Sequence, residues 1–341
     1  MGQVSTVGLD LAKHVFQAHG ADASGAVIFR KKLRRAQVLP FFAALPPCIV
    51  AMEACAGAHY WGREIGKLGH TTRLIAAAYV KPFVKRQKND LADAEAICEA
   101  AQRPTMRFVT VKTEEAQASA IVFRTRDLLV RQRTQIINAL RGHLAEFGVI
   151  AAKGLTHVGR LVALIDEPVA KLPEAVRAML HILVDGLSAL HRRITELDRE
   201  VERRAKEDAI ARRLMTIPGI GAVTATTLVS LAPPAENFRH GRDFAAWLGL
   251  TPLQRSSGGK ERLGRTSKMG ERTLRRLLII GANAVASWAA RNGAPKGSWL
   301  ARLMSRKPPM LVRVALANKM ARIVWALLMK GGVYQAPVAT A

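Results

Sequence analysis

The sequence predicts a multidomain α/β plus α protein with an N-terminal α/β domain, a helical arm and a basic, mainly helical C-terminal domain. Three observations predict this fold class. Apolar runs alternate with helical segments early in the chain, a long proline-free stretch with helical spacing follows, and most of the excess positive charge lies in the last third of the 341 residues. We place the domains at residues 1–110, 111–213 and 214–341.

The N-terminal domain is predicted to alternate strands with helices. Strands are expected at the apolar runs 4–12, 26–33, 48–54 and 72–77. Helices are expected at residues 36–45, 57–68 and 91–102. The first helix stops before Pro46, and either Asn89 or Asp90 caps the last one.

The arm is predicted from two long segments with helical spacing, residues 114–147 and 180–213. Arg and Glu recur three and four positions apart in the second segment, as on the exposed face of a paired helix. We therefore expect a coiled-coil-like arm that serves as an oligomer contact. Pro168 and Pro173 limit the segment between the two helices to a shorter helix with turns.

The C-terminal domain opens with a glycine turn ahead of a helix. Gly219 and Gly221 precede the apolar segment 222–231, as in the hairpin of a helix-hairpin-helix element, where backbone N–H groups contact phosphate. The alternative is an ordinary tight turn. A Gly/Ser loop at 255–260, a basic helix at 271–290 and a last helix at 310–329 follow, and the tryptophans of these helices are expected in the core.

The charge of the chain points to a polyanionic partner. Lys and Arg number 52 against 26 Asp and Glu, a net charge of +26, and residues 239–341 hold 19 of the basic residues and 3 of the acidic ones. Nucleic acid is the expected partner, with salt-dependent binding; the alternative is a solubilising or ribosome-associated surface. The basic side chains expected to contact phosphate are Arg30, Lys31, Lys32, Arg34, Arg35, Arg255, Lys260, Arg262, Arg265, Lys268, Arg272, Arg275 and Arg276.

Other classes of protein are not favoured. The sequence has no uncharged apolar stretch long enough to span a membrane, and Asp10 interrupts any secretory signal. The three cysteines form no CxxC pair, so neither structural zinc nor a disulfide framework is expected. We expect a soluble, cytoplasmic protein without a membrane partner.

Four carboxylates stand where catalysis would require them. Asp10 and Glu53 lie within apolar strand segments, where an unpaired charge is costly, and Asp90 and Asp93 lie on one side of a helix start. If the sheet brings these segments together, the clustered charge calls for Mg²⁺ or Mn²⁺, as in metal-assisted phosphoryl transfer. Taken singly, each residue has a simpler explanation: an exposed strand end, an ion pair with Arg86 or Lys88, or a helix cap.

Several segments of the chain resemble those of a known family. The segments GLDLAK (8–13), AMEACAGAHYW (51–61) and KNDLADAEAI (88–97) are similar to the Asp-Glu-Asp-Asp domain of the insertion-sequence "one-ten" transposases, with their "eleven-eleven" subgroup and the Piv-type DNA invertases. LMTIPGIGAVTATTLVS (214–230) and FAAWLGLTPLQRSSGGKERLGRTSKMGERTLRRLLIIGA (244–282) match the C-terminal part of that family. The resemblance covers nearly the whole chain.

The resemblance implies an RNase H-like domain similar to that of the RuvC resolvase, with Asp10, Glu53, Asp90 and Asp93 as catalytic metal ligands. It also implies that Ser257 is the nucleophile that forms a covalent serine–DNA intermediate. Ser256, in the same loop, is the alternative nucleophile. A base or a metal must activate such a serine, and the acidic cluster would do so if the two domains meet.

The resemblance further implies the partners. These are donor and target DNA, a structured guide (bridge) RNA encoded by the element, and further copies of the chain, as a dimer and as a tetramer in synapsis. The location is then the nucleoid of a bacterial cell. The sequence has no recognisable base-reading motif, which agrees with sequence choice delegated to base pairing.

Two other functions remain open from the residues. A structure-selective nuclease similar to RuvC would use the four carboxylates and a metal-activated water, and Ser257 would be dispensable. A non-catalytic nucleic-acid-binding protein would tolerate the loss of Asp10. The acidic set and the serine loop are both intact, which favours the recombinase.

Overall fold

The computed structural model describes residues 3–85, 89–295 and 297–336. The chain divides into two compact units, Met1–Gln117 and Ala118–Ala341. Among the described residues, no helix has the length and apolar character needed to span a membrane.

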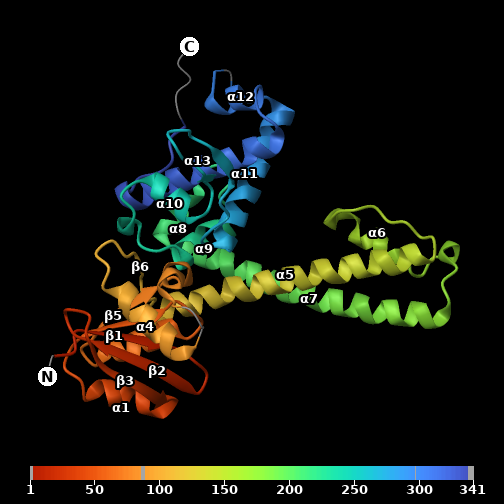
Figure 1. The fold of residues 1–341 in the computed structure, drawn as a ribbon. Coiled ribbons are helices and arrows are strands. Elements are labelled where there is room, and N and C mark those ends of the chain that lie inside the picture. Colours follow the sequence, from red (N-terminus) through yellow and green to blue (C-terminus); the bar gives the residue numbers. More distant parts are fainter. Residues whose placement is uncertain (1–2, 86–88, 296, 337–341) are drawn as a thin grey trace. The chain divides into compact units, whose positions relative to one another are not determined.

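The first unit is built on a six-stranded mixed sheet (Figure 1). Its strands are β1 (Thr6–Asp10), β2 (Val15–Ala21), β3 (Val27–Arg34), β4 (Ile49–Glu53), β5 (Thr71–Ile75) and β6 (Phe108–Val109). Their order is β3-β2-β1-β4-β5-β6; β1, β4 and β5 run parallel, and β2, β3 and β6 run antiparallel to their neighbours. The sequence did not predict β2 or β6, so the strand expected second is the third in the chain.

Helices cover both faces of this sheet. On one face, α1 (Val38–Ala43) and α2 (Ala58–Lys67) share an apolar core with β1, β2 and β4, in which Phe16 packs edge-on against the buried Trp61. On the other face, α4 (Asp90–Ala101) packs over β1, β2, β4 and β5, and α3 (Ala77–Val80) lies beside it. The Asn89 side chain accepts a 2.8 Å hydrogen bond from the backbone N–H of Ala92 and caps α4. Asp90 is therefore not the cap.

The arm is a pair of long helices, α5 (Glu114–Glu146) and α7 (Glu174–Glu207), with α6 (Val158–Ala163) at its far end (Figure 1). An apolar cluster between α5, α6 and α7 includes Leu140, Leu161 and Leu187. The second predicted helix ends earlier than expected. Asp208 accepts hydrogen bonds from two backbone N–H groups and starts the separate helix α8 (Ala209–Met215).

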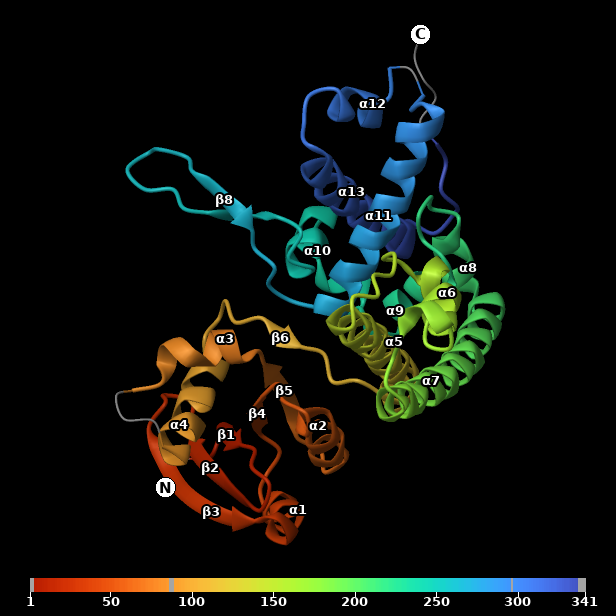
Figure 2. The ribbon, with the colours of Figure 1, turned by 90° about the vertical axis from the view of Figure 1, so that its right-hand side faces the viewer.

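The remaining elements form one helical body with a projecting β-hairpin (Figure 2). They are α9 (Ala222–Leu231), α10 (Gly241–Trp247), β7 (Pro252–Gln254), β8 (Leu263–Thr266), α11 (Arg272–Asn292), α12 (Trp299–Met304) and α13 (Pro309–Lys330). Phe244, Leu274 and Met320 lie in its core. Trp288, expected in the core, is 56% exposed on α11 because it lies on the face turned away from that core.

Short 3₁₀ helices complete the described elements. They lie at Arg35–Gln37, Lys81–Phe83, Leu155–His157, Pro168–Ala170 and Ala235–Asn237.

Candidate active site

Two of the four carboxylates end neighbouring parallel strands. Asp10 is the last residue of β1 and Glu53 the last residue of β4. The pairing of Leu9 with Met52 places the next residues of both strands side by side. Because side chains alternate along a strand, Asp10 and Glu53 project from the same face, opposite the buried Leu9 and Met52.

Helix α4 adds the other two carboxylates. It lies directly on β1, and the contact depends on Gly8: a Cβ there would lie 2.2 Å from the carbonyl oxygen of Ala94 and 2.6 Å from the backbone nitrogen of Cys98. This close approach brings the first turn of α4, which carries Asp90 and Asp93, to the end of β1. Sequence reasoning did not single out Gly8, although a glycine two residues before a strand-ending aspartate is a usable signal.

The electrostatics of Asp10 reflect this convergence. Burial, followed by the charges of Asp93, Asp90 and Glu53 in that order, raises the pKa of Asp10 from 3.8 to about 6, against a lowering hydrogen bond from the backbone of Leu11. Among the described residues, none of the four carboxylates forms an ion pair with Lys or Arg. The structure thus places Glu53, Asp90 and Asp93 near enough to Asp10 for their charges to act on it. The charge of Asp93 raises the pKa of Asp10 more than that of Asp90 does.

The donor set fits a hard divalent cation in its chemistry. All four groups offer oxygen ligands, the choice of Mg²⁺ and Mn²⁺. Within the described part of the chain, no three His, Cys, Asp or Glu side chains stand close enough together to hold a metal ion as they are. Like charges so placed repel one another, and a bound cation would offset that repulsion.

Gly8→Ala is expected to destabilise the protein by roughly 1–3 kcal/mol, because the added methyl group forces α4 away from β1. Urea unfolding measures the change. Gly142→Ala is the matched control: Gly142 lies within α5, with no heavy atom within 4 Å of an added Cβ, so this change should be neutral or stabilising. Equal free energies of unfolding for Gly8→Ala and the wild type would contradict the packing argument.

The basic run at 30–35 does not form one surface. Strand β3 is the edge of the sheet, so its side chains alternate between two faces. Arg30 forms a 3.4 Å ion pair with Glu95 of α4, whereas Lys31 lies 5.0 Å from the ring centre of Phe41 on the other face. The guanidinium of Arg35 lies over Trp61. Lys32 and Arg34 remain exposed.

The predicted Gly/Ser loop is the tip of the β7–β8 hairpin (Figure 2). Gly258 and Gly259 both have positive φ, 57° and 74°, and the backbone N–H of Lys260 donates a 3.1 Å hydrogen bond to the carbonyl of Ser257. Two central residues with positive φ are typical of a type I′ turn, which matches the twist of the strands. A Gly-Gly pair between two short polar segments is a sequence signal for a hairpin, and the prediction of a loop overlooked it.

The two serines of this hairpin differ. The Ser256 hydroxyl accepts hydrogen bonds from the Gln254 amide (3.2 Å) and from the backbone N–H of Arg262 (3.3 Å). Ser257 is exposed beside the turn, and its hydroxyl has no hydrogen-bond partner among the described residues. Of the two hydroxyls, that of Ser257 is the one without a hydrogen-bond partner among the described residues.

The glycine turn at 217–221 serves helix packing in part. A Cβ on Gly219 would lie 2.7 Å from the carbonyl oxygen of Gly281, and one on Gly281 would lie 2.1 Å from that of Gly219. This contact with α11 requires a residue without a side chain at position 219. Gly221 is exposed at the start of α9, with nothing within 4 Å of an added Cβ.

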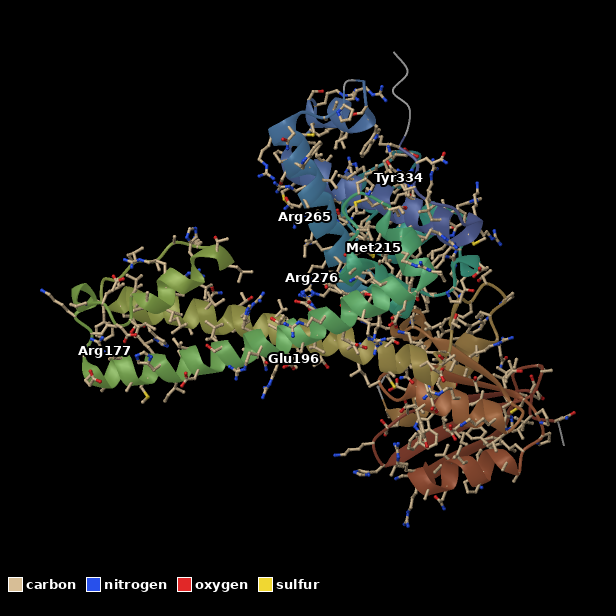
Figure 3. All side chains as sticks on the ribbon, turned by 180° about the vertical axis from the view of Figure 1, so that it is seen from behind. Arg177, Glu196, Met215, Arg265, Arg276 and Tyr334 are labelled. Carbon is tan, nitrogen blue, oxygen red and sulfur yellow. The ribbon has the colours of Figure 1, made fainter. Side chains whose placement is uncertain are left out.

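In the C-terminal part of the chain, Arg275 and Arg276 were expected to contact phosphate but are engaged within the protein. Arg275 donates to the carbonyls of Leu248 (3.0 Å) and Met269 (2.8 Å), and burial lowers its pKa. Arg276 on α11, labelled in Figure 3, pairs with Asp127 of α5. By contrast Arg255, Lys260, Arg262, Arg265, Lys268 and Arg272 are exposed.

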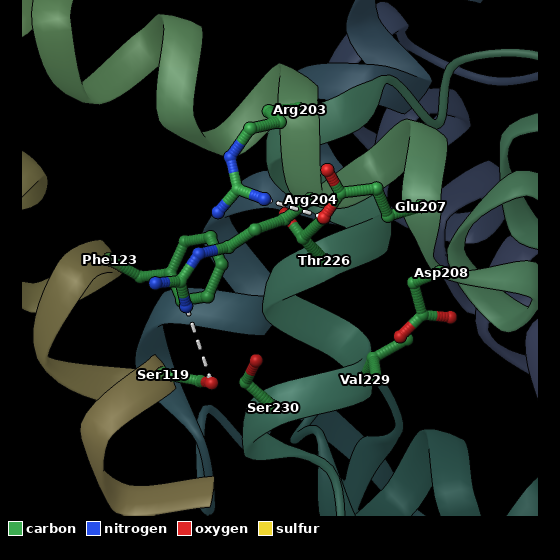
Figure 4. A pocket seen from close by; sticks show the side chains of 9 residues that line it. All are labelled: Ser119, Phe123, Arg203, Arg204, Glu207, Asp208, Thr226, Val229 and Ser230. Carbon is green, nitrogen blue, oxygen red and sulfur yellow. Dashed lines mark hydrogen bonds and ion pairs between the residues drawn. The ribbon is translucent and has the colours of Figure 1, made fainter. Parts of the chain in front are cut away.

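A cavity at the base of the arm carries no obvious chemistry (Figure 4). Its two arginines are already neutralised or bonded: Arg203 pairs with Glu200 and Glu207, and Arg204 pairs with Glu200 and donates to Ser119. We therefore place no function there.

Two transposase families match the chain. Residues 7–149 match the DEDD transposase family of IS110, and residues 211–295 match the family described as "Transposase IS116/IS110/IS902 family". The DEDD domain suggests divalent metal dependence.

Full-length relatives carry the same description. The chain is 50% identical to a probable family 20 transposase of Pseudomonas aeruginosa, over 97% of this chain and 99% of the relative. It is 41% identical to the transposase for insertion sequence element IS1328 of Yersinia enterocolitica (98% and 99% covered) and 39% identical to that for IS1111A of Coxiella burnetii (98% and 92%). The chain therefore belongs to the IS110/IS116/IS902 family of insertion-sequence transposases, which are DNA recombination enzymes.

Proposed function

We propose that this transposase cuts and rejoins DNA through an ester between Ser257 and a DNA phosphate, and that Asp10, Glu53, Asp90 and Asp93 hold Mg²⁺ or Mn²⁺ for the reaction. The observation that carries the proposal is the convergence of four carboxylates, unpaired among the described residues, that raises the pKa of Asp10 to about 6. Such a cluster is costly to the fold unless a cation binds there.

The serine step exchanges one phosphate ester for another. The Ser257 oxygen bonds to the phosphorus of the scissile phosphodiester, and the bond from phosphorus to a deoxyribose oxygen breaks. The serine proton leaves to a base, and the departing oxygen takes up a proton to become a sugar hydroxyl. Rejoining reverses the step: the hydroxyl of another strand attacks the phosphoserine and releases Ser257.

The basic side chains of the hairpin support the attack of Ser257 on the phosphate. Arg255, Lys260 and Arg262 flank the exposed hydroxyl of Ser257, and they would stabilise the negative charge that develops on the phosphate oxygens. A bound divalent cation would supply further charge neutralisation and favour an ionised hydroxyl or water.

The first unit supports an RNase H-like assignment. Three antiparallel strands, β1–β3, continue into the parallel strands β4 and β5, and acidic residues end β1 and β4. Guidance by an element-encoded bridge RNA, contact between copies through the arm and a place at the nucleoid complete the proposal. The large positive charge and the exposed basic hairpin support nucleic-acid partners.

Arg265→Gln is expected to lower the salt dependence of DNA binding by about one unit of log–log slope, because an exposed phosphate contact releases about one counterion. Arg276→Gln is the control, since Asp127 already neutralises that arginine, and its slope should stay close to that of the wild type. Fluorescence anisotropy at several salt concentrations measures both slopes. Equal slopes for Arg265→Gln and the wild type would remove this residue from the interface.

A covalent-trapping assay tests the proposal. The protein is incubated with the RNA of its element's flank, labelled donor and target DNA and Mg²⁺, quenched with detergent and run on a denaturing gel. A labelled protein–DNA band supports the serine ester. DNA cleavage without such a band supports the water-using nuclease instead, and DNA binding without cleavage supports a non-catalytic binding protein.

A further inference from the structure

A buried polar side chain on β2 has no partner. Gln17 is 8% exposed, and its Oε1 is inaccessible and accepts no hydrogen bond among the described residues. Leaving a buried acceptor unsatisfied costs about 1–3 kcal/mol. An apolar side chain of similar size would avoid this cost, so the amide requires an explanation.

The position of Gln17 in the sheet explains why this residue is polar. In the register of β1 with β2, Gln17 is the residue directly opposite Asp10. Opposed residues of antiparallel strands share a face, with Cβ atoms about 4.5–5.5 Å apart. The neighbouring residues Phe16 and Ala18 lie in the core on the other face, so Gln17 projects toward the acidic site.

We propose that Gln17 supplies a neutral oxygen ligand to the divalent cation of the acidic site. The inference rests on the proposed function of that site and adds a residue to it. Amide carbonyl oxygens, like carboxylates and water, suit Mg²⁺ and Mn²⁺. Four carboxylates already exceed the charge of one such ion. An amide adds a ligand without adding to the repulsion.

The same strand provides a matched control. His19 is 4% exposed, lies on the same face, and its Nδ1 is also unpartnered among the described residues. It stands opposite Gly8 instead of Asp10, two residues away from the carboxylate. A loss caused by general disturbance of β2 should appear equally at both positions.

The test measures Mn²⁺ binding to the full-length protein by titration calorimetry, alongside the thermal midpoint of the metal-free protein. Gln17→Met, close in size but without polar atoms, should raise the dissociation constant for Mn²⁺ about tenfold or more. Its metal-free thermal midpoint should equal or exceed that of the wild type, because the unsatisfied acceptor is gone. His19→Leu should bind Mn²⁺ as the wild type does.

A tenfold loss in His19→Leu would overturn the proposal, because the shape of β2 would then explain the effect. Equal affinity of Gln17→Met and the wild type would overturn it as well.

Asp10→Asn separates this inference from the proposed function. If Asp10→Asn loses Mn²⁺ binding while Gln17→Met keeps it, only the role of Gln17 fails. If Asp10→Asn binds Mn²⁺ as the wild type does, or the wild type binds none, the metal site of the proposed function fails, and the Gln17 ligand fails with it.

Discussion

Ser257→Ala is expected to abolish the covalent protein–DNA band and to lower strand cleavage by roughly 10⁴-fold or more, because Ser257 supplies the oxygen of the proposed ester. The hydroxyl lies exposed at the hairpin tip without a hydrogen-bond partner among the described residues. Its removal should leave the free energy of unfolding and the affinity for DNA close to those of the wild type. Trapping on a denaturing gel, binding anisotropy and urea unfolding measure the three quantities.

Ser256→Ala is the matched control one residue away. Its hydroxyl accepts two hydrogen bonds within the hairpin, so the change should loosen the tip and reduce the rate only modestly while the adduct still forms. An adduct that persists in Ser257→Ala and disappears in Ser256→Ala would assign the nucleophile to Ser256. Cleavage without an adduct in both variants would favour a water nucleophile.

The sequence predicted the acidic residues better than their surroundings. A carboxylate inside an apolar run is conspicuous, so Asp10 and Glu53 could be found from local pattern alone. Their alignment depends on the parallel pairing of β1 with β4, which is a long-range contact. The approach of α4 depends on one missing side chain, at Gly8, whose importance appears only when the helix is in place.

Strand β2 was missed because its inward-facing residues on one side are polar. Gln17 and His19 interrupt the apolar pattern of this strand, although both side chains are buried. The β7–β8 hairpin was interpreted as a loop for the opposite reason: its strands are polar and largely exposed, so periodicity carries little signal. Nor could composition show that Arg275 binds two backbone carbonyls instead of phosphate.

Asp10→Asn is expected to lower DNA cleavage by roughly 10³-fold or more while it stabilises the metal-free protein. The amide resembles the protonated carboxyl in shape, so packing is kept, and it removes the charge that burial, Asp93, Asp90 and Glu53 oppose. Loss of activity with a gain in stability is typical of a residue kept for function at a cost to the fold. Trapping and urea unfolding without metal provide the two measurements.

The gain in stability from Asp10→Asn is expected to depend on pH. The pKa of Asp10 is about 6 in the folded protein and near 3.8 in the unfolded chain, so the unfolded chain releases its proton first as pH rises. Ionisation therefore costs folding stability between about pH 4 and pH 6, and the full cost persists above pH 6. The stability advantage of Asp10→Asn should be small at pH 4, grow to pH 7 and then level off. Added Mn²⁺ at pH 7 should stabilise the wild type and leave the stability of Asp10→Asn unchanged. If the stability advantage of Asp10→Asn did not depend on pH, the charge repulsion on which the proposed metal site depends would be contradicted.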